Sequence, residues 1–97
     1  MKYIVETTSL FDKWHRSLRD LRAKMAVARR LEQVENGNFG DHKAVGEGVS
    51  EMRIHIGAGY RLYYTIRNLQ IVFLLYGGDK SSQQTDIKRA VDLAKEL

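Results

Sequence analysis

Three β-prone segments follow one another between residues 49 and 76, and they constrain the fold more than any other feature of the chain. Residues 49–56 and 60–67 alternate apolar and polar side chains, whereas residues 69–76 are apolar on both faces. Short polar or glycine-rich turns separate the three. The pattern predicts an antiparallel meander in which the third segment is a central strand, because a strand covered on both faces is apolar throughout.

Helices are predicted before these strands. Residues 1–7 form a short β-prone run, and Ser9 is then the expected N-cap of a helix. Apolar residues recur three and four positions apart over residues 11–34, which is typical of a helical face. One kinked helix or a hairpin of two helices would explain this spacing, with the joint near residues 18–21. Asn36-Gly37 is the expected end.

The rest of the chain completes a small α+β fold. A glycine-rich loop has a possible short strand over residues 42–45, and Gly77-Gly78 is expected to break the third strand of the meander. Ser81 and Gln84 then form a capping box that begins a last amphipathic helix. We expect a single domain over residues 1–97, with the helices packed on one face of the sheet.

Composition and charge narrow the class of protein. The chain has 97 residues, no cysteine and no apolar run long enough for a membrane span, so disulfides and thiolate metal sites are excluded. Residues 1–9 lack the features of a secretory signal, and we expect a cytoplasmic protein. Sixteen Lys and Arg against twelve Asp and Glu give a net charge of +4. This favours nucleic acid or an acidic protein as partner, although a solvated basic surface would look the same.

Basic side chains on the polar faces of two neighbouring strands are the strongest candidate site. If the segments form a hairpin of matching parity, Arg53 and His55 share a sheet face with Arg61 and Tyr63. Lys80 follows the next strand at the rim of the same surface. The alternative interpretation is that these residues only form the solvent-exposed face of a half-buried sheet.

Such a group of side chains suits cleavage of an RNA phosphodiester without a metal ion. Arginine and lysine stabilise the charge that builds on the phosphorane oxygens. His55 is a candidate acid or base near neutral pH, and Lys80 could exchange a proton. Tyr63 could stack on a base or hold a phosphate. The three histidines lack metal-ligand spacing and neither glycine pair matches a phosphate loop, so we expect no metal and no cofactor.

A second basic surface is predicted on the helical region. Arg16, Arg19 and Arg22 belong to a run of basic residues that alternate with apolar positions between residues 13 and 30. These three are our candidate contacts to RNA phosphates, for example those of ribosomal RNA. A solvated helix face is the alternative.

Several motifs also resemble a known family. Three stretches, in their order and spacing, are similar to the RelE/ParE/HigB toxin superfamily, in particular to its phage-derived Gp49-like, HigB-type branch. They are FDKWHRSLRDLRAKMAVARRL, SEMRIHIGAGYRLYY and VFLLYGGDKSSQQTDIKRAVDLA. The resemblance covers nearly the whole chain. It implies a RelE-like compact fold: a small antiparallel-dominated β-sheet with two N-terminal helices and a C-terminal helix.

The resemblance also implies a function. Members of this branch are toxins of type II toxin–antitoxin systems that cleave messenger RNA, commonly on the ribosome. Each is blocked by a cognate antitoxin, usually a helix-turn-helix HigA-like protein through which the pair reaches operator DNA. Arg53, Arg61 and Lys80 match the positions of the family's basic catalytic or RNA-binding residues. Gyrase poisoning of the ParE kind and non-catalytic binding of RNA or protein remain alternatives, and the general base is not assigned.

Overall fold

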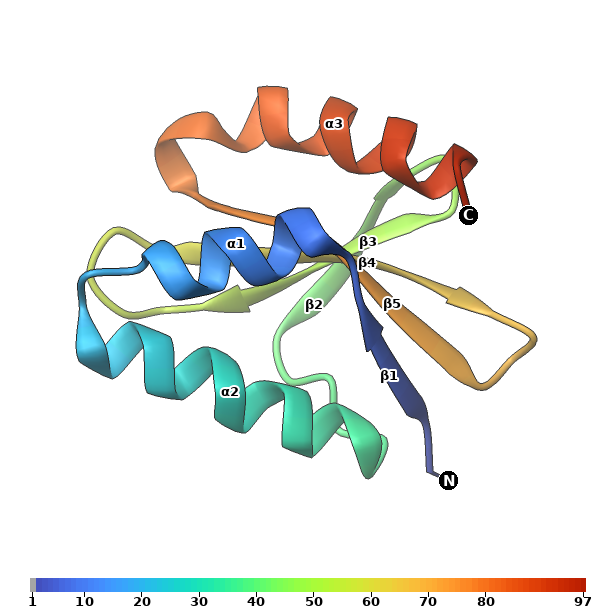
Figure 1. The fold of residues 1–97 in the computed structure, drawn as a ribbon, viewed down its shortest axis with the longest axis horizontal. Helices are drawn as coiled ribbons and strands as arrows, with labels where there is room; N and C mark the ends of the chain where they lie inside the picture. Colours follow the sequence, from blue (N-terminus) through green and yellow to red (C-terminus); the bar gives the residue numbers. More distant parts are fainter. Residues whose placement is uncertain (1) are drawn as a thin grey trace.

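The computed structural model describes residues 2–97, and the first residue of the predicted N-terminal strand, Met1, lies outside this range (Figure 1). Within it, the elements follow in the order β1 (Ile4–Thr7), α1 (Ser9–Ser17), α2 (Leu21–Glu35), β2 (His42–Gly46), β3 (Val49–Ile54), β4 (Tyr60–Arg67), β5 (Ile71–Asp79), the 3₁₀ turn η1 (Lys80–Ser82) and α3 (Gln83–Lys95). None of these helices is long and apolar enough to cross a membrane.

The sheet has five strands in the order β1-β5-β4-β3-β2. Strands β3 to β5 form the antiparallel meander that the three segments predicted, and β2 extends it by pairing antiparallel with β3. The apolar strand β5 lies between β4 and β1, so its predicted central position is confirmed. Strand β1 pairs with β5 in parallel, which the sequence pattern did not indicate. The sheet is therefore antiparallel-dominated with one parallel edge.

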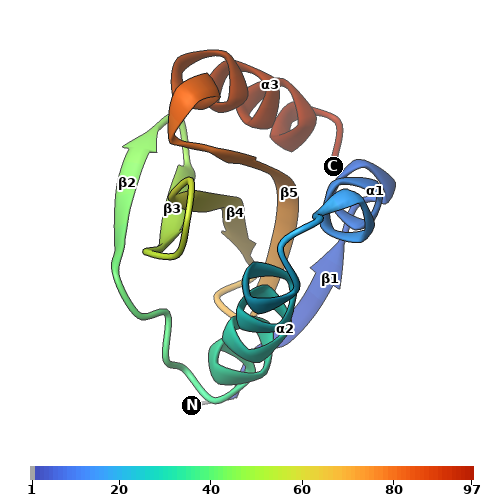
Figure 2. The same ribbon diagram turned by 90° about the vertical axis from the view of Figure 1, so that its left-hand side faces the viewer.

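Helices cover both faces of the sheet, which corrects the expectation that all of them pack on one face (Figure 2). Helices α1 and α2 bury one core, whose members include Phe11 and Val27 from the helices and Met52, Leu62 and Leu74 from the sheet. Helix α3 buries a second core on the opposite face, formed by Val49, Tyr63, Leu75, Ala90, Val91 and Ala94. Two covered faces are the physical reason that β5 is apolar on both sides.

The N-terminal helical region is a hairpin of two helices. Thr8, and not the expected Ser9, caps α1: its Oγ1 accepts a hydrogen bond of 3.0 Å from the amide of Phe11. The chain leaves the helix at Leu18, and the carboxylate of Asp20 caps α2 by accepting from the amide of Arg22 at 3.0 Å. The joint thus falls within the predicted interval, and α2 ends where Asn36-Gly37 predicted.

Strand β5 continues through Gly77 and Gly78 to Asp79, so the expectation that these glycines break the strand was wrong. They permit close packing instead, because a Cβ at Gly77 would overlap the ring of Trp14 and a Cβ at Gly78 would overlap the Asp86 carboxylate. The expected capping box of Ser81 and Gln84 does not begin the last helix either. Asp79 caps the 3₁₀ turn, and α3 starts one turn later with Ser82 at its N-cap.

Candidate functional site

A cavity of about 330 Å³ opens at the end of the sheet where the β3–β4 turn meets the start of η1. Its lining consists of Arg53, His55, Gly57, Ala58, Gly59, Arg61 and Lys80. The four residues that the sequence offered as catalytic candidates therefore lie around one cavity. Among the described residues, none of α3 lines the cavity, since this helix begins only at Gln83.

Arg53 and Arg61 lie directly opposite each other on β3 and β4 and point to the same face of the sheet, which confirms the parity argument. Their side chains are 26% and 12% exposed, so both are partly buried. Nη1 of Arg61 donates a hydrogen bond of 3.0 Å to the carbonyl of Gly59 in the turn. Like charges directly opposite on neighbouring strands repel each other, so this pair needs a compensating anion.

Glu51 supplies that anion from a position two residues before Arg53 on the same strand. Its side chain is fully buried, and Oε2 accepts a hydrogen bond of 2.8 Å from Nε of Arg53 and lies 3.8 Å from Nε of Arg61. This hydrogen bond raises the pKa of Arg53 above its ordinary value. Oε1 accepts from Nε2 of Gln83 at 3.0 Å, which ties the first residue of α3 to the site.

Glu51 is a residue that the sequence reasoning missed as part of the site. Strand alternation does put Glu51 on the face of Arg53 and His55, so a signal for its position existed. The burial of Glu51 beneath the N-terminus of α3 depends on tertiary packing, which strand alternation does not predict.

His55 forms a pair with Asp41, which the sequence reasoning also missed. Nε2 of His55 lies 2.7 Å from Oδ2 of Asp41, just before β2, and Nη1 of Arg53 lies 4.0 Å from the same oxygen. The hydrogen bond with His55, with smaller help from the charge of Arg53, holds the pKa of Asp41 below its ordinary value. This partner favours the tautomer with a proton on Nε2 and leaves Nδ1 as the proton-accepting nitrogen.

Lys80 lies at the start of η1, exposed at the rim of the cavity. The neighbouring Asp79 accepts hydrogen bonds from the side chain and the amide of Ser81, which lower the pKa of Asp79. The Asp79 carboxylate is thus engaged in capping the turn from which Lys80 projects.

Tyr63 does not belong to the exposed site. It shares the sheet face with Arg61, but α3 covers it completely, and its ring packs in the core with Val49, Leu75 and Ala90. Burial raises the pKa of its hydroxyl. A fully buried ring offers no surface for a base, so the expectation that Tyr63 stacks on RNA does not fit the structure.

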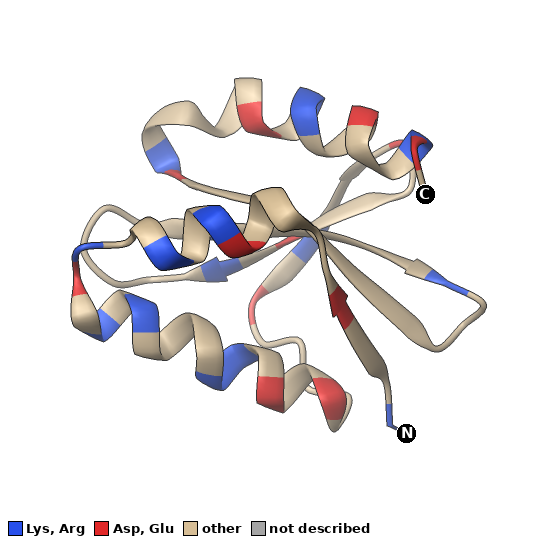
Figure 3. Ribbon diagram, viewed as in Figure 1, with Lys and Arg blue, Asp and Glu red and all other residues tan. Residues whose placement is uncertain are grey.

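Arg16, Arg19 and Arg22 lie outside the cavity lining, exposed around the joint between α1 and α2. The joint nevertheless packs close to the cavity, because a Cβ built at Gly57 would lie 3.3 Å from Oδ2 of Asp20. Figure 3 shows Lys and Arg positions gathered at this end of the molecule, on α1, the joint and the first half of α2. The basic helical surface therefore flanks the cavity.

Comparison with known proteins identifies the family. Residues 11–97 match the model of the family described as "Phage derived protein Gp49-like (DUF891)", so the chain belongs to this family. A protein of Haemophilus influenzae, described as an uncharacterized protein, is 48% identical over 93 residues, which cover 96% of this chain and 94% of that protein.

A solved structure shares the fold. The E. coli toxin RelE, in the structure of a double mutant in the free state, aligns with a TM-score of 0.68 at 20% sequence identity, covering 92% of this chain and 98% of that one. The RelE-like α+β fold expected from the sequence is therefore confirmed.

Proposed function

We propose that this protein is the toxin of a type II toxin–antitoxin pair, and that it is an endoribonuclease which cuts messenger RNA on the ribosome. The observation that carries the proposal is the pair of arginines, Arg53 and Arg61, held side by side by a buried glutamate at the open end of the sheet. The family membership and the fold shared with a protein described as a toxin are consistent with it.

The arginine pair has the properties needed to hold a scissile phosphate. Two guanidinium groups on partly buried side chains interact more strongly with an anion than fully exposed ones do, because less solvent screens the charge. Contacts with Glu51 and the Gly59 carbonyl fix them before the substrate arrives. Fixed cations of this kind stabilise the developing charge of the phosphorane without reorganising during the reaction.

The same cavity offers groups for the two proton transfers. In our proposal, His55, oriented by Asp41, takes the proton of the 2′-hydroxyl through Nδ1. The 2′-oxygen attacks the phosphorus, a 2′,3′-cyclic phosphate forms, and the bond to the 5′-oxygen breaks. Lys80, at the rim, gives a proton to this leaving oxygen or neutralises its charge. The chemistry balances without a redox partner or a metal ion.

Binding of a long substrate needs contacts beyond the cavity. Arg16, Arg19 and Arg22 are proposed to hold phosphates of the messenger or of ribosomal RNA, since they are exposed on the surface that flanks the cavity. Such contacts give affinity without sequence preference.

Membership of this family also supports the existence of a protein partner, an antitoxin. We propose that a small helix-turn-helix, HigA-like antitoxin neutralises the chain, and that the pair reaches operator DNA only through that antitoxin. Co-expression with the adjacent gene is expected to restore growth.

Inducible expression followed by mapping of messenger RNA 5′ ends tests the proposed function. We expect arrest of translation together with new 5′ ends inside coding regions. Growth arrest with a DNA-damage response and intact messages would instead identify a gyrase poison, and would contradict the nuclease.

A further inference from the structure

A second hollow lies between α1 and α3, away from the arginine cavity. It has a volume of about 340 Å³ and is lined by Leu10, Lys13, Trp14, Ser17, Tyr76 and Arg89. The ring of Trp14 lies directly on β5, because a Cβ at Gly77 would overlap that ring. The proposed reaction uses none of these side chains.

The chemistry of the hollow suits a nucleotide. It presents the rings of Trp14 and Tyr76, and the guanidinium of Arg89 lies over the Tyr76 ring at 5.4 Å from its centroid. Unpaired bases stack on aromatic rings and on guanidinium planes. Lys13 and Arg89 add two positive charges, and among the described residues that line the hollow none is acidic. A base with its adjacent phosphate therefore finds both a stacking surface and counter-charges.

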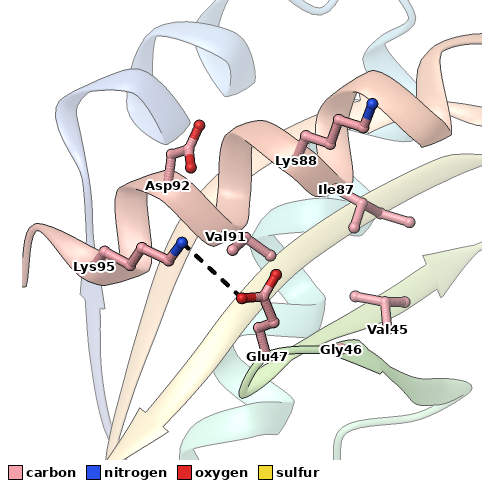
Figure 4. A pocket seen from close by; sticks show the side chains of 8 residues that line it. All are labelled: Val45, Gly46, Glu47, Ile87, Lys88, Val91, Asp92 and Lys95. Carbon is pink, nitrogen blue, oxygen red and sulfur yellow. Dashed lines mark ion pairs between the residues drawn. The ribbon is translucent and has the colours of Figure 1, made fainter.

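A different hollow, between the β2–β3 turn and α3, has a lining of another kind (Figure 4). Its floor is formed by aliphatic side chains, and its rim mixes both signs of charge, with Lys95 3.9 Å from Glu47 and Asp92 close by. Carboxylates at the rim repel a phosphate, so this hollow does not fit the same ligand. Lys88 lines it and is the sequence neighbour of Arg89, which makes Lys88 a matched control position.

The aromatic hollow and the arginine cavity flank the same end of β5. Tyr76 is four residues before Lys80, and Gly78, between them, pairs with Arg61. On the sheet face covered by α1 and α2, the ring centroid of Trp14 lies 6.4 Å from that of Tyr60, which directly precedes Arg61 in the chain. At about 3.3 Å per strand residue, Tyr76 and Lys80 are roughly 13 Å apart, which a few nucleotides of single strand can span.

We propose that this hollow is a nucleotide subsite, in which an unpaired base of the RNA strand held at Arg53 and Arg61 stacks on Trp14 and Arg89 while its phosphate contacts Lys13. This inference rests on the proposed function and extends it, because it names a second point at which the substrate strand is held. The strand then passes over the Asp79–Lys80 segment between the two sites.

Trp14 makes the subsite measurable, since it is the single tryptophan of the chain. The probe is a short oligouridylate with 2′-O-methyl groups, which lacks the nucleophile and cannot be cut by the proposed reaction. Titration of the purified protein is expected to change Trp14 fluorescence in a saturable way. Arg89→Ala should weaken binding about fivefold to tenfold, because the variant provides neither the stacking plane nor the charge of the guanidinium. Arg89→Lys keeps the positive charge without the planar guanidinium, and it should recover part of the affinity that Arg89→Ala loses.

Lys88→Ala removes one charge from the adjacent position of the same helix and is expected to bind the probe nearly as the wild type does. Circular dichroism and thermal unfolding verify that each variant is folded; both side chains are exposed. The subsite is refuted, and the proposed function is untouched, if Arg61→Ala weakens binding while Trp14 fluorescence stays constant and Arg89→Ala binds normally. Absence of any binding by the wild type would also overturn the subsite, whereas the proposed function is decided by the mapping of messenger RNA 5′ ends.

Discussion

The two ends of strand β4 on its α3-facing side carry an arginine each, and the surroundings of the two arginines differ. Arg67, at one end, donates through Nη2 to the carbonyl of Ala94 at 3.0 Å, near the C-terminus of α3. Arg61, at the other end, lies where α3 has not yet begun, beside Arg53 and above a buried carboxylate. Tyr63 and Thr65, between them, are buried. The point at which α3 begins therefore divides this face into a structural part and an open, cationic part.

Exchange of Arg61 and Arg67 for alanine, one at a time, should show the largest difference between the two ends of the strand. Arg61→Ala is expected to abolish toxicity and to lower the rate of RNA cleavage by about 100-fold or more, because it removes a fixed cation at the phosphate. Arg67→Ala should remain toxic and be less stable to unfolding by about 1 kcal/mol, the value of one hydrogen bond. Growth assays and denaturant unfolding measure both. Unreduced toxicity of a folded Arg61→Ala protein would refute the assignment of the site.

Removal of Glu51 tests what holds the open end together. Glu51→Ala should destabilise the fold by about 3 kcal/mol, since it leaves two partly buried arginine side chains without their counter-charge. Glu51→Gln keeps the volume of the side chain but not its charge. We expect this variant to be more stable than Glu51→Ala and to cleave RNA more slowly than the wild type. Gln83→Ala is the control, because it removes one hydrogen bond to Glu51 and leaves the arginine contacts in place. Wild-type cleavage by a folded Glu51→Gln would show that the arginines need no such support.

Lys80 distinguishes binding from chemistry. It lies at the rim, so Lys80→Ala is expected to slow single-turnover cleavage roughly tenfold and to change the binding constant much less. Rates and binding constants measured with the same RNA give the two numbers. If binding fell as much as the rate did, Lys80 would be a phosphate contact only.

The pair of Asp41 and His55 should show a pH dependence of known sign. The pKa of Asp41 is lowered in the folded protein, so the stability that this pair contributes is present above the ordinary aspartate pKa and disappears as pH falls through the lowered value. Denaturant unfolding of Asp41→Asn should therefore differ from wild type near neutral pH and converge with it in acid. Cleavage at neutral pH should fall roughly threefold, as expected for an exposed pair. An equal difference at all pH values would contradict this.

The basic surface around the α1–α2 joint should have the smallest effect. Joint replacement of Arg16, Arg19 and Arg22 by glutamine is expected to weaken binding of all RNA sequences alike. It should also reduce the slope of log affinity against log salt by about 0.7 for each phosphate that the variant no longer neutralises. An unchanged slope would show that these side chains form only a solvated helix face.

Local sequence patterns predicted the part of the site that depends on strand geometry. A period of two and a short glycine turn put Arg53 and Arg61 on one face, and the register places them directly opposite each other. His55 and Lys80 reached the same cavity for similar reasons, since each follows from strand parity or from the end of a strand.

Features that depend on distant packing were not predictable in this way. Tyr63 has the parity of an exposed residue, and only the position of α3 on that face buries it. Gly77 and Gly78 have the composition of a turn, but the approach of Trp14 and Asp86 explains them as close-packed strand residues. Asp41 meets His55 across 14 residues of sequence, a pairing that no local pattern contains.

A nuclear magnetic resonance titration shows whether a phosphate binds at the open part of the α3-facing side, on which the proposed function depends. The side-chain Nε–H signals of all arginines would be followed while the 2′-O-methyl oligouridylate is added. We expect the signals of Arg53 and Arg61 to move in a saturable way while that of Arg67 stays in place. Unmoved Arg53 and Arg61 signals in the presence of bound RNA would show that the phosphate does not bind at this pair.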